Sequence, residues 1–212
     1  MESKFQNRAE AGRQLAEKLT AYRGQRDAIV LGLPRGGVPV AAAVARQLGL
    51  PLDVFVVRKL GVPGFEELAM GAIASGNVVV LNDEVMHAVP NAEAILESVR
   101  ARETLELQRR EKQYRQNRDA PDLRGRVAVL VDDGVATGAT MRAAVAALRK
   151  QSVTKIVAAV PVGAPETCRE LEREVDEMVC AFSPASFHGV GQFYEDFSQT
   201  TDEEVRELLN DE

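Results

Sequence analysis

The feature that most constrains the fold is the stretch from Val127 to Thr140, VAVLVDDGVATGAT. The unbroken apolar run over residues 127–131 predicts a strand buried on both faces, as in parallel sheets. Two carboxylates, Asp132 and Asp133, follow the strand, and a turn of small residues leads into a predicted helix. This order predicts an open α/β sheet that binds its ligand at the carboxyl ends of the strands.

The rest of the chain continues the alternation of strands and helices. Further strands are predicted at residues 28–31, 52–57, 78–81, 154–160 and 177–182. Helices are predicted at residues 7–22, 38–48, 92–118, 139–150 and 165–174, with another starting near Thr201. This succession predicts a Rossmann-like α/β domain of three layers around a central, largely parallel sheet.

Two segments do not fit that rhythm. Residues 59–71 contain several glycines and Pro63 among charged groups, so we expect a mobile loop there. Residues 92–118 lack Gly and Pro and are dense in Glu and Arg, which predicts a long solvated helix. A dimer arm is the alternative interpretation of that helix, and it leaves a homodimer open.

Length and charge limit the possible functions. A chain of 212 residues is expected to form a single domain over residues 1–212, with small hood elements within 1–27 and 183–212. The net charge of −6 offers no basic excess for nucleic-acid backbones, so nucleic acid is not an expected partner.

The sequence shows no sign of export, membrane insertion or metal-binding cysteines. Residues 1–12 lack the apolar core of a signal peptide, and no apolar run approaches the roughly 18 residues of a membrane span. A soluble, cytoplasmic protein without a membrane partner is therefore expected. Cys168 and Cys180 have no CxxC spacing, which argues against structural zinc and a disulfide framework.

The loop after residue 131 has the chemistry of a phosphate site. Backbone N–H groups at a helix start bind anions, and hydroxyls add donors. The residues placed to do so are Ala136, Thr137, Gly138, Ala139 and Thr140. Asp132 and Asp133 would repel a phosphate unless they face ribose hydroxyls or Mg²⁺. The pattern therefore matches a ribose 5-phosphate.

Other phosphate-binding motifs are absent. No Lys follows Gly138 as GxxxxGK[ST] requires, and residues 32–37 lack the GxGxxG spacing. The stretch VLVDDGVATGAT closely resembles the ribose-phosphate motif of type I phosphoribosyltransferases, which bind 5-phosphoribosyl 1-pyrophosphate (PRPP). The resemblance implies their α/β fold.

Two further segments fit the family's order. Pro34-Arg35-Gly36-Gly37 resembles the pyrophosphate-binding turn, in which the peptide next to the basic residue is often cis or strained. Arg35, Gly36 and Gly37 would then bind pyrophosphate. Arg58 and Lys59 resemble the entrance to a flexible catalytic loop.

The resemblance implies a reaction in which a nitrogen nucleophile displaces pyrophosphate from C1 of the ribose. The implied cofactor is Mg²⁺, held by Asp132 and Asp133, directly or through water. These acids would also fix the ribose, and Arg58 or Lys59 would help to stabilise the leaving group. The implied partners are PRPP and a small nitrogenous acceptor.

The resemblance also bears on the acceptor. Phe187, ahead of Val190 and Gly191, is similar to an aromatic that stacks on a purine, which implies a purine-like nucleobase and a role in purine salvage. In the hypoxanthine–guanine branch an aspartate stands where this chain has Ala136, and a lysine is expected within residues 160–165, which hold none. A 6-oxopurine substrate is therefore not favoured.

A regulator that senses PRPP on the same fold is the alternative to an enzyme. Such a protein would need a basic face for nucleic acid, and the short cluster at residues 109–118 is interleaved with Glu106 and Glu111. The charge pattern favours the enzyme. The sequence leaves open the acceptor, the oligomeric state and metal occupancy.

Overall fold

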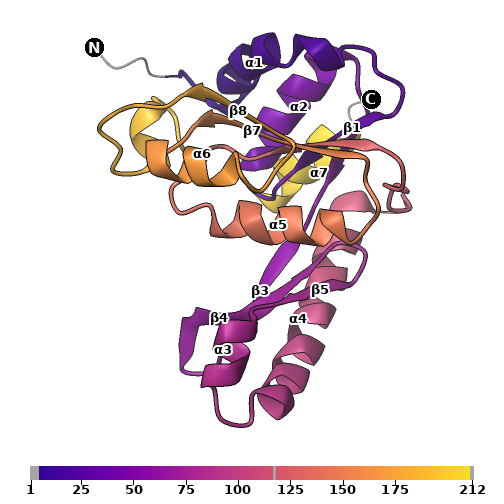
Figure 1. Ribbon diagram of the computed structural model, residues 1–212. Coiled ribbons are helices and arrows are strands. Elements are labelled where there is room, and N and C mark those ends of the chain that lie inside the picture. The colour runs from indigo at the N-terminus through magenta and orange to yellow at the C-terminus, as the bar shows by residue number, and fades with distance from the viewer. Residues whose placement is uncertain (1–4, 117, 211–212) are drawn as a thin grey trace.

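The computed structural model describes residues 5–116 and 118–210. Residues 1–4 of the expected hood, position 117 of the helix expected over 92–118, and residues 211–212 lie outside the described part. The molecule has a layered body from which an arm projects (Figure 1). Among the described residues, no helix is both long and apolar enough to cross a membrane.

The body is built on a parallel sheet with the strand order β2-β1-β6-β7-β8. Its strands are β1 (Ala28–Gly32), β2 (Leu52–Val54), β6 (Val127–Val131), β7 (Lys155–Val162) and β8 (Glu177–Phe182). Strands β1 and β6 pair in register from Ala28 opposite Val127 to Gly32 opposite Val131. The two loops that follow these strands therefore start side by side at the carboxyl edge of the sheet.

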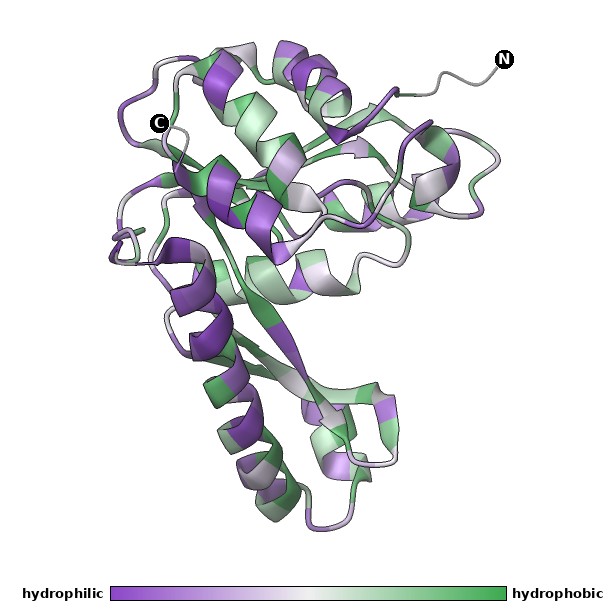
Figure 2. Ribbon diagram, turned by 180° about the vertical axis from the view of Figure 1, so that it is seen from behind, coloured by the Kyte–Doolittle hydropathy of each residue, from purple (hydrophilic) through white to green (hydrophobic). Residues whose placement is uncertain are grey.

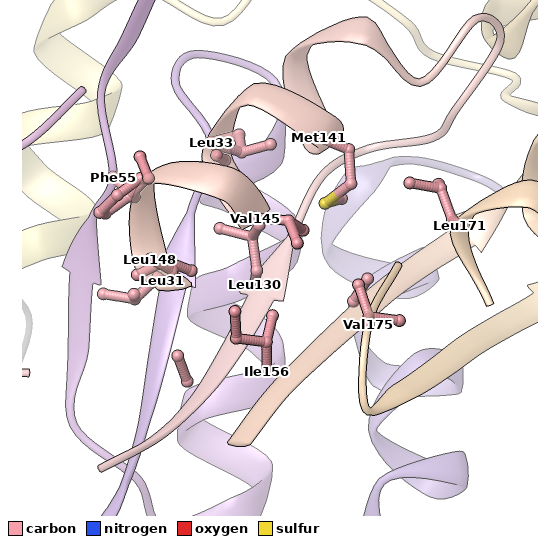
Figure 3. Packing of buried hydrophobic residues seen from close by; sticks show 14 of the residues in the cluster. Leu31, Leu33, Phe55, Leu130, Met141, Val145, Leu148, Ile156, Leu171 and Val175 are labelled. Carbon is pink, nitrogen blue, oxygen red and sulfur yellow. The ribbon is translucent and has the colours of Figure 1, made fainter. Parts of the chain in front are cut away.

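Helices cover both faces of this sheet, so the predicted three-layer α/β class is confirmed. They are α1 (Arg8–Lys18) and α2 (Gly37–Leu48) on one face and α5 (Ala139–Arg149) and α6 (Pro165–Leu171) on the other. Successive residues of β1 alternate between the two cores: Val30 packs with α1 and α2, and Leu31 packs with α5. Figure 3 shows the second core, where Leu130 and Ile156 lie beneath Val145.

The arm replaces the mobile loop expected at residues 59–71, and that expectation is wrong. Strands β3 (Val57–Val62), β4 (Phe65–Ala74) and β5 (Val78–Leu81) form an antiparallel sheet. Pro63 and Gly64 make the hairpin turn, with Gly64 at a φ of 82°. A Cβ on Gly61 would lie 2.7 Å from the carbonyl oxygen of Glu66. The glycines thus permit close strand approach and an irregular register.

The expected solvated helix is only partly solvated. Helix α4 (Ala92–Arg115) follows the short α3 (Asp83–Ala88) and packs on β3 and β4. Its inner face buries Val99, Leu107 and Tyr114, while its outer face is hydrophilic (Figure 2). The strand expected over residues 52–57 is also shorter, because β2 ends at Val54 and the chain then turns into the arm.

The start of the described chain meets the segment around residue 194 beside the carboxyl edge of the sheet. Phe5 forms a bridge with Tyr194, and its amide donates to the carbonyl oxygen of Phe193 at 2.8 Å. Phe182 and Phe187 complete this aromatic cluster, which we call the hood cluster. Helix α7 (Asp202–Asn210) then packs against α2 and α4.

Candidate active site

A cavity of about 170 Å³ lies at the carboxyl end of β6, within the predicted phosphate loop. Its lining includes all the residues predicted to bind a phosphate: Ala136, Thr137, Gly138, Ala139 and Thr140. Asp132 contributes to the same wall. The structure therefore brings one carboxylate and the start of α5 to one hollow.

Three contacts shape this loop. Gly138 caps α5 in the left-handed region with a φ of 72°, and a Cβ there would lie 2.8 Å from Cγ2 of Thr167. The Thr167 hydroxyl donates to the carbonyl oxygen of Ala136 at 2.6 Å, and Arg142 Nη1 donates to that of Thr137 at 2.6 Å. The carbonyls are thus engaged by α5 and α6, while the first amides of α5 have no acceptor within the helix. This arrangement suits an anion.

The turn between β1 and α2 packs directly on the end of β6. The Pro34–Arg35 peptide is cis, as the resemblance implied. A Cβ on Gly37 would lie 2.7 Å from the carbonyl oxygen of Val131 and 2.9 Å from Cα of Asp132. Because these neighbours are backbone atoms, this position accepts no side chain. The predicted pyrophosphate turn and the predicted phosphate loop are therefore in contact.

Arg35 stands at the outer side of this turn. Its Nη1 lies 3.9 Å from Oδ1 of Asp202, at the start of α7, and the Arg35 side chain is 36% exposed. The hydroxyl of Tyr114 donates to the same Asp202 oxygen at 2.8 Å. Helix α7 thus places a carboxylate beside the cation that we predicted to bind pyrophosphate.

The structure separates the two adjacent acids. Asp132 lines the phosphate cavity, whereas Asp133 accepts a hydrogen bond from Arg8 Nε at 2.8 Å. Burial raises the pKa of the Asp132 carboxyl well above its usual value, and the neighbouring charge of Asp133 adds to that effect. Burial also raises the pKa of Asp133, although Arg8 opposes the shift.

The donor set fits a metal that arrives with a phosphorylated substrate. In the described part of the chain, no three His, Cys, Asp or Glu side chains gather as a metal cluster. Asp132 and Asp133 are the carboxylates that follow β6 at this edge. Mg²⁺ commonly uses one or two protein carboxylates and takes its other ligands from water and substrate phosphates.

Arg58 and Lys59 point to opposite sides of the arm. Arg58 donates to Oε2 of Glu103 on α4, from Nε at 2.9 Å and from Nη2 at 2.6 Å. Lys59 lines a hollow of about 380 Å³ between the arm and α5, together with Ala139 and Arg142. The structure thus brings Lys59, and not Arg58, toward the helix that begins at the phosphate loop.

Phe187 lines a second cavity, of about 660 Å³, next to the phosphate loop. Ala136 contributes to both cavities, and Thr167 and Ser183 lie on the wall of the second one. The Phe187 ring stacks on Phe193, with centroids 5.6 Å apart and planes 26° apart. This contact covers one face of the Phe187 ring and orients the side chain.

The sequence analysis missed several residues that complete the site. They are Arg8, Tyr114, Thr167, Tyr194 and Asp202, which reach it from α1, α4, α6, the hood cluster and α7. Tyr194 donates to the backbone carbonyl of Asp133 at 2.6 Å. Arg8, Tyr194 and Asp202 belong to the expected hood segments and Tyr114 to the expected long helix, but none of them was assigned to the site. All five lie outside the motifs at residues 34–37, 58–59 and 127–140, so no local pattern marks them.

Comparison with known proteins identifies a family model and a similar solved structure. A model of the phosphoribosyl transferase domain matches residues 3–197. A structure of TT1426 from Thermus thermophilus superposes with a TM-score of 0.86 at 43% identity, covering 97% of each chain. The fold of nearly the whole chain therefore recurs in a solved structure of similar length.

Two curated proteins from Mycobacterium tuberculosis strains are also similar. They are named "Putative phosphoribosyl transferase MT0597" and "Putative phosphoribosyl transferase Rv0571c". Each is 48% identical over 206 residues, which is 97% of this chain but 46% of theirs. The chain thus spans about half the length of these relatives.

Proposed function

The chain belongs to the phosphoribosyl transferase domain family, and from this premise we propose that it transfers the 5-phosphoribosyl group of PRPP to a nitrogen of a small acceptor, releasing pyrophosphate. The observation that carries the proposal is the direct contact between the turn ending at Gly37 and the end of β6, where Asp132 begins the phosphate loop. A ligand with a phosphate at one end and a pyrophosphate at the other would span these two loops.

Each part of PRPP has a counterpart at this edge. The 5-phosphate would bind the first amides of α5, over residues 136–140. The ribose hydroxyls would donate to Asp132. The pyrophosphate would bind backbone amides at Gly36 and Gly37 together with the Arg35 guanidinium, which must turn from Asp202 to reach it.

Departure of pyrophosphate leaves positive charge on the ribose ring, as in glycosyl transfer. A carboxylate in a poorly solvated site stabilises that charge more strongly than water would, and Asp132 has this environment. Mg²⁺, held by the pyrophosphate oxygens and by Asp132 or Asp133, would neutralise charge on the leaving group. Arg35 would act on the same group, and Lys59, which lines the hollow beside the start of α5, would be the arm residue that helps.

The acceptor would enter the cavity lined by Phe187. One face of the Phe187 ring packs against Phe193, and the other face would stack on a planar heteroaromatic molecule. This favours a purine-like nucleobase, and the absence of Lys from residues 160–165 argues against a 6-oxopurine. Purine salvage is the corresponding role.

One observation favours the second candidate, a PRPP sensor without catalysis. The segment expected to be a flexible catalytic loop is a paired hairpin, and Arg58 within it is engaged by Glu103. A nucleic-acid output is not supported, because Arg109 and Arg110 pair with Glu106, and Arg115 is buried beside Asp53. The sensor would therefore have to act on another kind of partner.

The test is paired. Calorimetry measures PRPP binding with and without Mg²⁺, and a pyrophosphate-release assay screens a panel of nucleobases. We expect Asp132→Asn to reduce turnover further than PRPP affinity, because its charge matters most as the ribose becomes cationic. Asp122→Asn, at an exposed site paired with Arg124, is the matched control.

The outcomes separate the candidates. Binding without pyrophosphate release on any acceptor would favour the sensor. Failure of the wild type to bind PRPP in either condition would reject both. Equal losses of turnover and affinity in Asp132→Asn would contradict the catalytic role of that residue.

A further inference from the structure

Arg8 contacts Asp133 and also the C-terminal segment at residues 197–198. It is the first residue of α1, and its Nε donates to Oδ2 of Asp133 at 2.8 Å. Its Nη1 donates to the backbone carbonyl of Ser198 at 2.7 Å, and its guanidinium carbon lies 4.1 Å from the ring centroid of Phe197. The Arg8 and Asp133 side chains are 11% and 15% exposed.

The packing of α1 on α2 places Arg8 at the site. Gly12, one turn further along α1, lets the two helices approach so closely that a Cβ there would lie 2.7 Å from Cβ of Ala43. The N-terminus of α2 is the pyrophosphate turn, and a Cβ on Gly36 would lie 3.2 Å from Arg8 Nε. Arg8 is thus held where α1, α2 and the end of β6 meet.

Asp133 is held in place by contacts of both its side chain and its backbone. Its carboxylate points at the Gly36 backbone, so a side chain at position 36 would collide with it. Its backbone carbonyl accepts the hydrogen bond from Tyr194 at 2.6 Å. Both ends of the residue are therefore fixed, and Asp133 does not line the phosphate cavity as Asp132 does.

We propose that Arg8 is a positioning residue that holds Asp133 against the pyrophosphate turn and leaves Asp132 as the carboxylate that faces the sugar. This inference rests on the proposed function, because it assigns the two acids different roles toward PRPP. Arg8 also neutralises one of two adjacent negative charges at a site for a polyanion, which reduces repulsion of the ligand.

A double-mutant cycle tests the proposal. PRPP affinity is measured by calorimetry, in Mg²⁺, for wild type, Arg8→Gln, Asp133→Asn and the double variant. We expect Arg8→Gln to weaken binding by about tenfold or more in the wild-type background and by less than about threefold in the Asp133→Asn background, because the two side chains act as a pair.

Two further variants separate positioning from general stability. Arg8→Lys keeps the charge and should recover most of the affinity lost in Arg8→Gln. Arg13→Gln changes an exposed arginine on the same helix and should bind as the wild type does. Circular dichroism and Tm of each variant identify any that fail to fold, and Arg8→Lys then provides the comparison.

The proposal and the proposed function fail in different ways. If the wild type binds PRPP but Arg8→Gln binds equally well, Arg8 does not position the site. The same conclusion follows if the effects of Arg8→Gln and Asp133→Asn simply add. If the wild type binds no PRPP, the proposed function fails first and the assignment of Arg8 fails with it.

Discussion

The two sheets of this protein differ in strand direction and in how completely they are buried. The parallel sheet of the body is covered on both faces, and β1 and β6 are buried along their whole length. The antiparallel sheet of the arm packs against α4 and α5, yet it leaves Phe65 72% and Leu81 44% exposed. The loops that we propose to bind the ligand follow strands of the body, so their positions depend on the more completely buried of the two sheets.

The arm is joined to the body by polar contacts as well as apolar ones. Arg115 at the end of α4 bonds to both carboxylate oxygens of Asp53 in β2 at 3.0 Å and to the carbonyl oxygen of Val54 at 2.9 Å. Burial raises the pKa of Asp53, although Arg115 opposes the shift. The comparison teaches that the body derives its order from strands buried along their whole length, whereas the arm combines partly exposed strands with buried contacts to α4 and α5 and with paired charges.

The largest effect should come from placing a side chain where the turn after β1 contacts the end of β6. Gly37→Val adds side-chain atoms at a position where even a Cβ would lie 2.7 Å from a backbone oxygen. We expect PRPP affinity to fall by at least about 100-fold, and stability by roughly 3 kcal/mol, because neither loop can move without disturbing the sheet. Calorimetry and urea unfolding measure the two losses. Gly64→Ala, in the hairpin turn of the arm, is the control and should leave PRPP binding intact.

An intermediate effect is expected from the core of the arm. Leu60 is fully buried on β3 beneath α4, and Leu60→Ala should cost about 2–4 kcal/mol locally. Hydrogen exchange should then rise more over β3 and β4 than over β6, because no residue of β6 belongs to this cluster. Phe65→Ala, at an exposed position on the same sheet, should change neither. A uniform rise in exchange over both sheets would show that arm and body unfold together.

The smallest effect concerns the buried charge in the body. Folding raises the pKa of Asp132, so the protonated acid is favoured in the folded state. The stability associated with it is fully present below the unfolded pKa and is lost as pH rises through the folded value. Asp132→Asn cannot ionise, so without ligand and with EDTA its Tm at pH 7 should exceed the wild-type Tm by about 2–4 °C, which roughly 1 kcal/mol produces in a chain of this size.

The pH dependence of that difference is the check. It should shrink toward zero near pH 4, where the wild-type carboxyl is also protonated. Asp122→Asn is the contrasting variant, because Arg124 lowers the pKa of Asp122 to about 2 and no gain at pH 7 is expected there. A Tm for Asp132→Asn at or below that of the wild type at pH 7 would show that the Asp132 charge is well stabilised without ligand.

The sequence by itself determined the body and the phosphate loop. The apolar run at residues 127–131, the acids after it and the small residues around Gly138 are consecutive, so their local structure follows from strand propensity, a helix start and the freedom of one glycine. The family was identified from the same residues, and the comparisons confirm it. Of the residues that line the cavity proposed for the acceptor, the sequence analysis had singled out Ala136 and Phe187.

Only the tertiary structure decided the arm and the difference between the two acids. Glycine and proline among charges indicate a loop locally, but Gly61 and Gly71 lie in strands because Leu60 and Met70 are buried beneath α4. Asp132 and Asp133 are equivalent in the sequence, yet Arg8 lies 125 positions from Asp133 along the chain. Contacts at that separation depend on how helices pack on the sheet, and no local pattern contains that information.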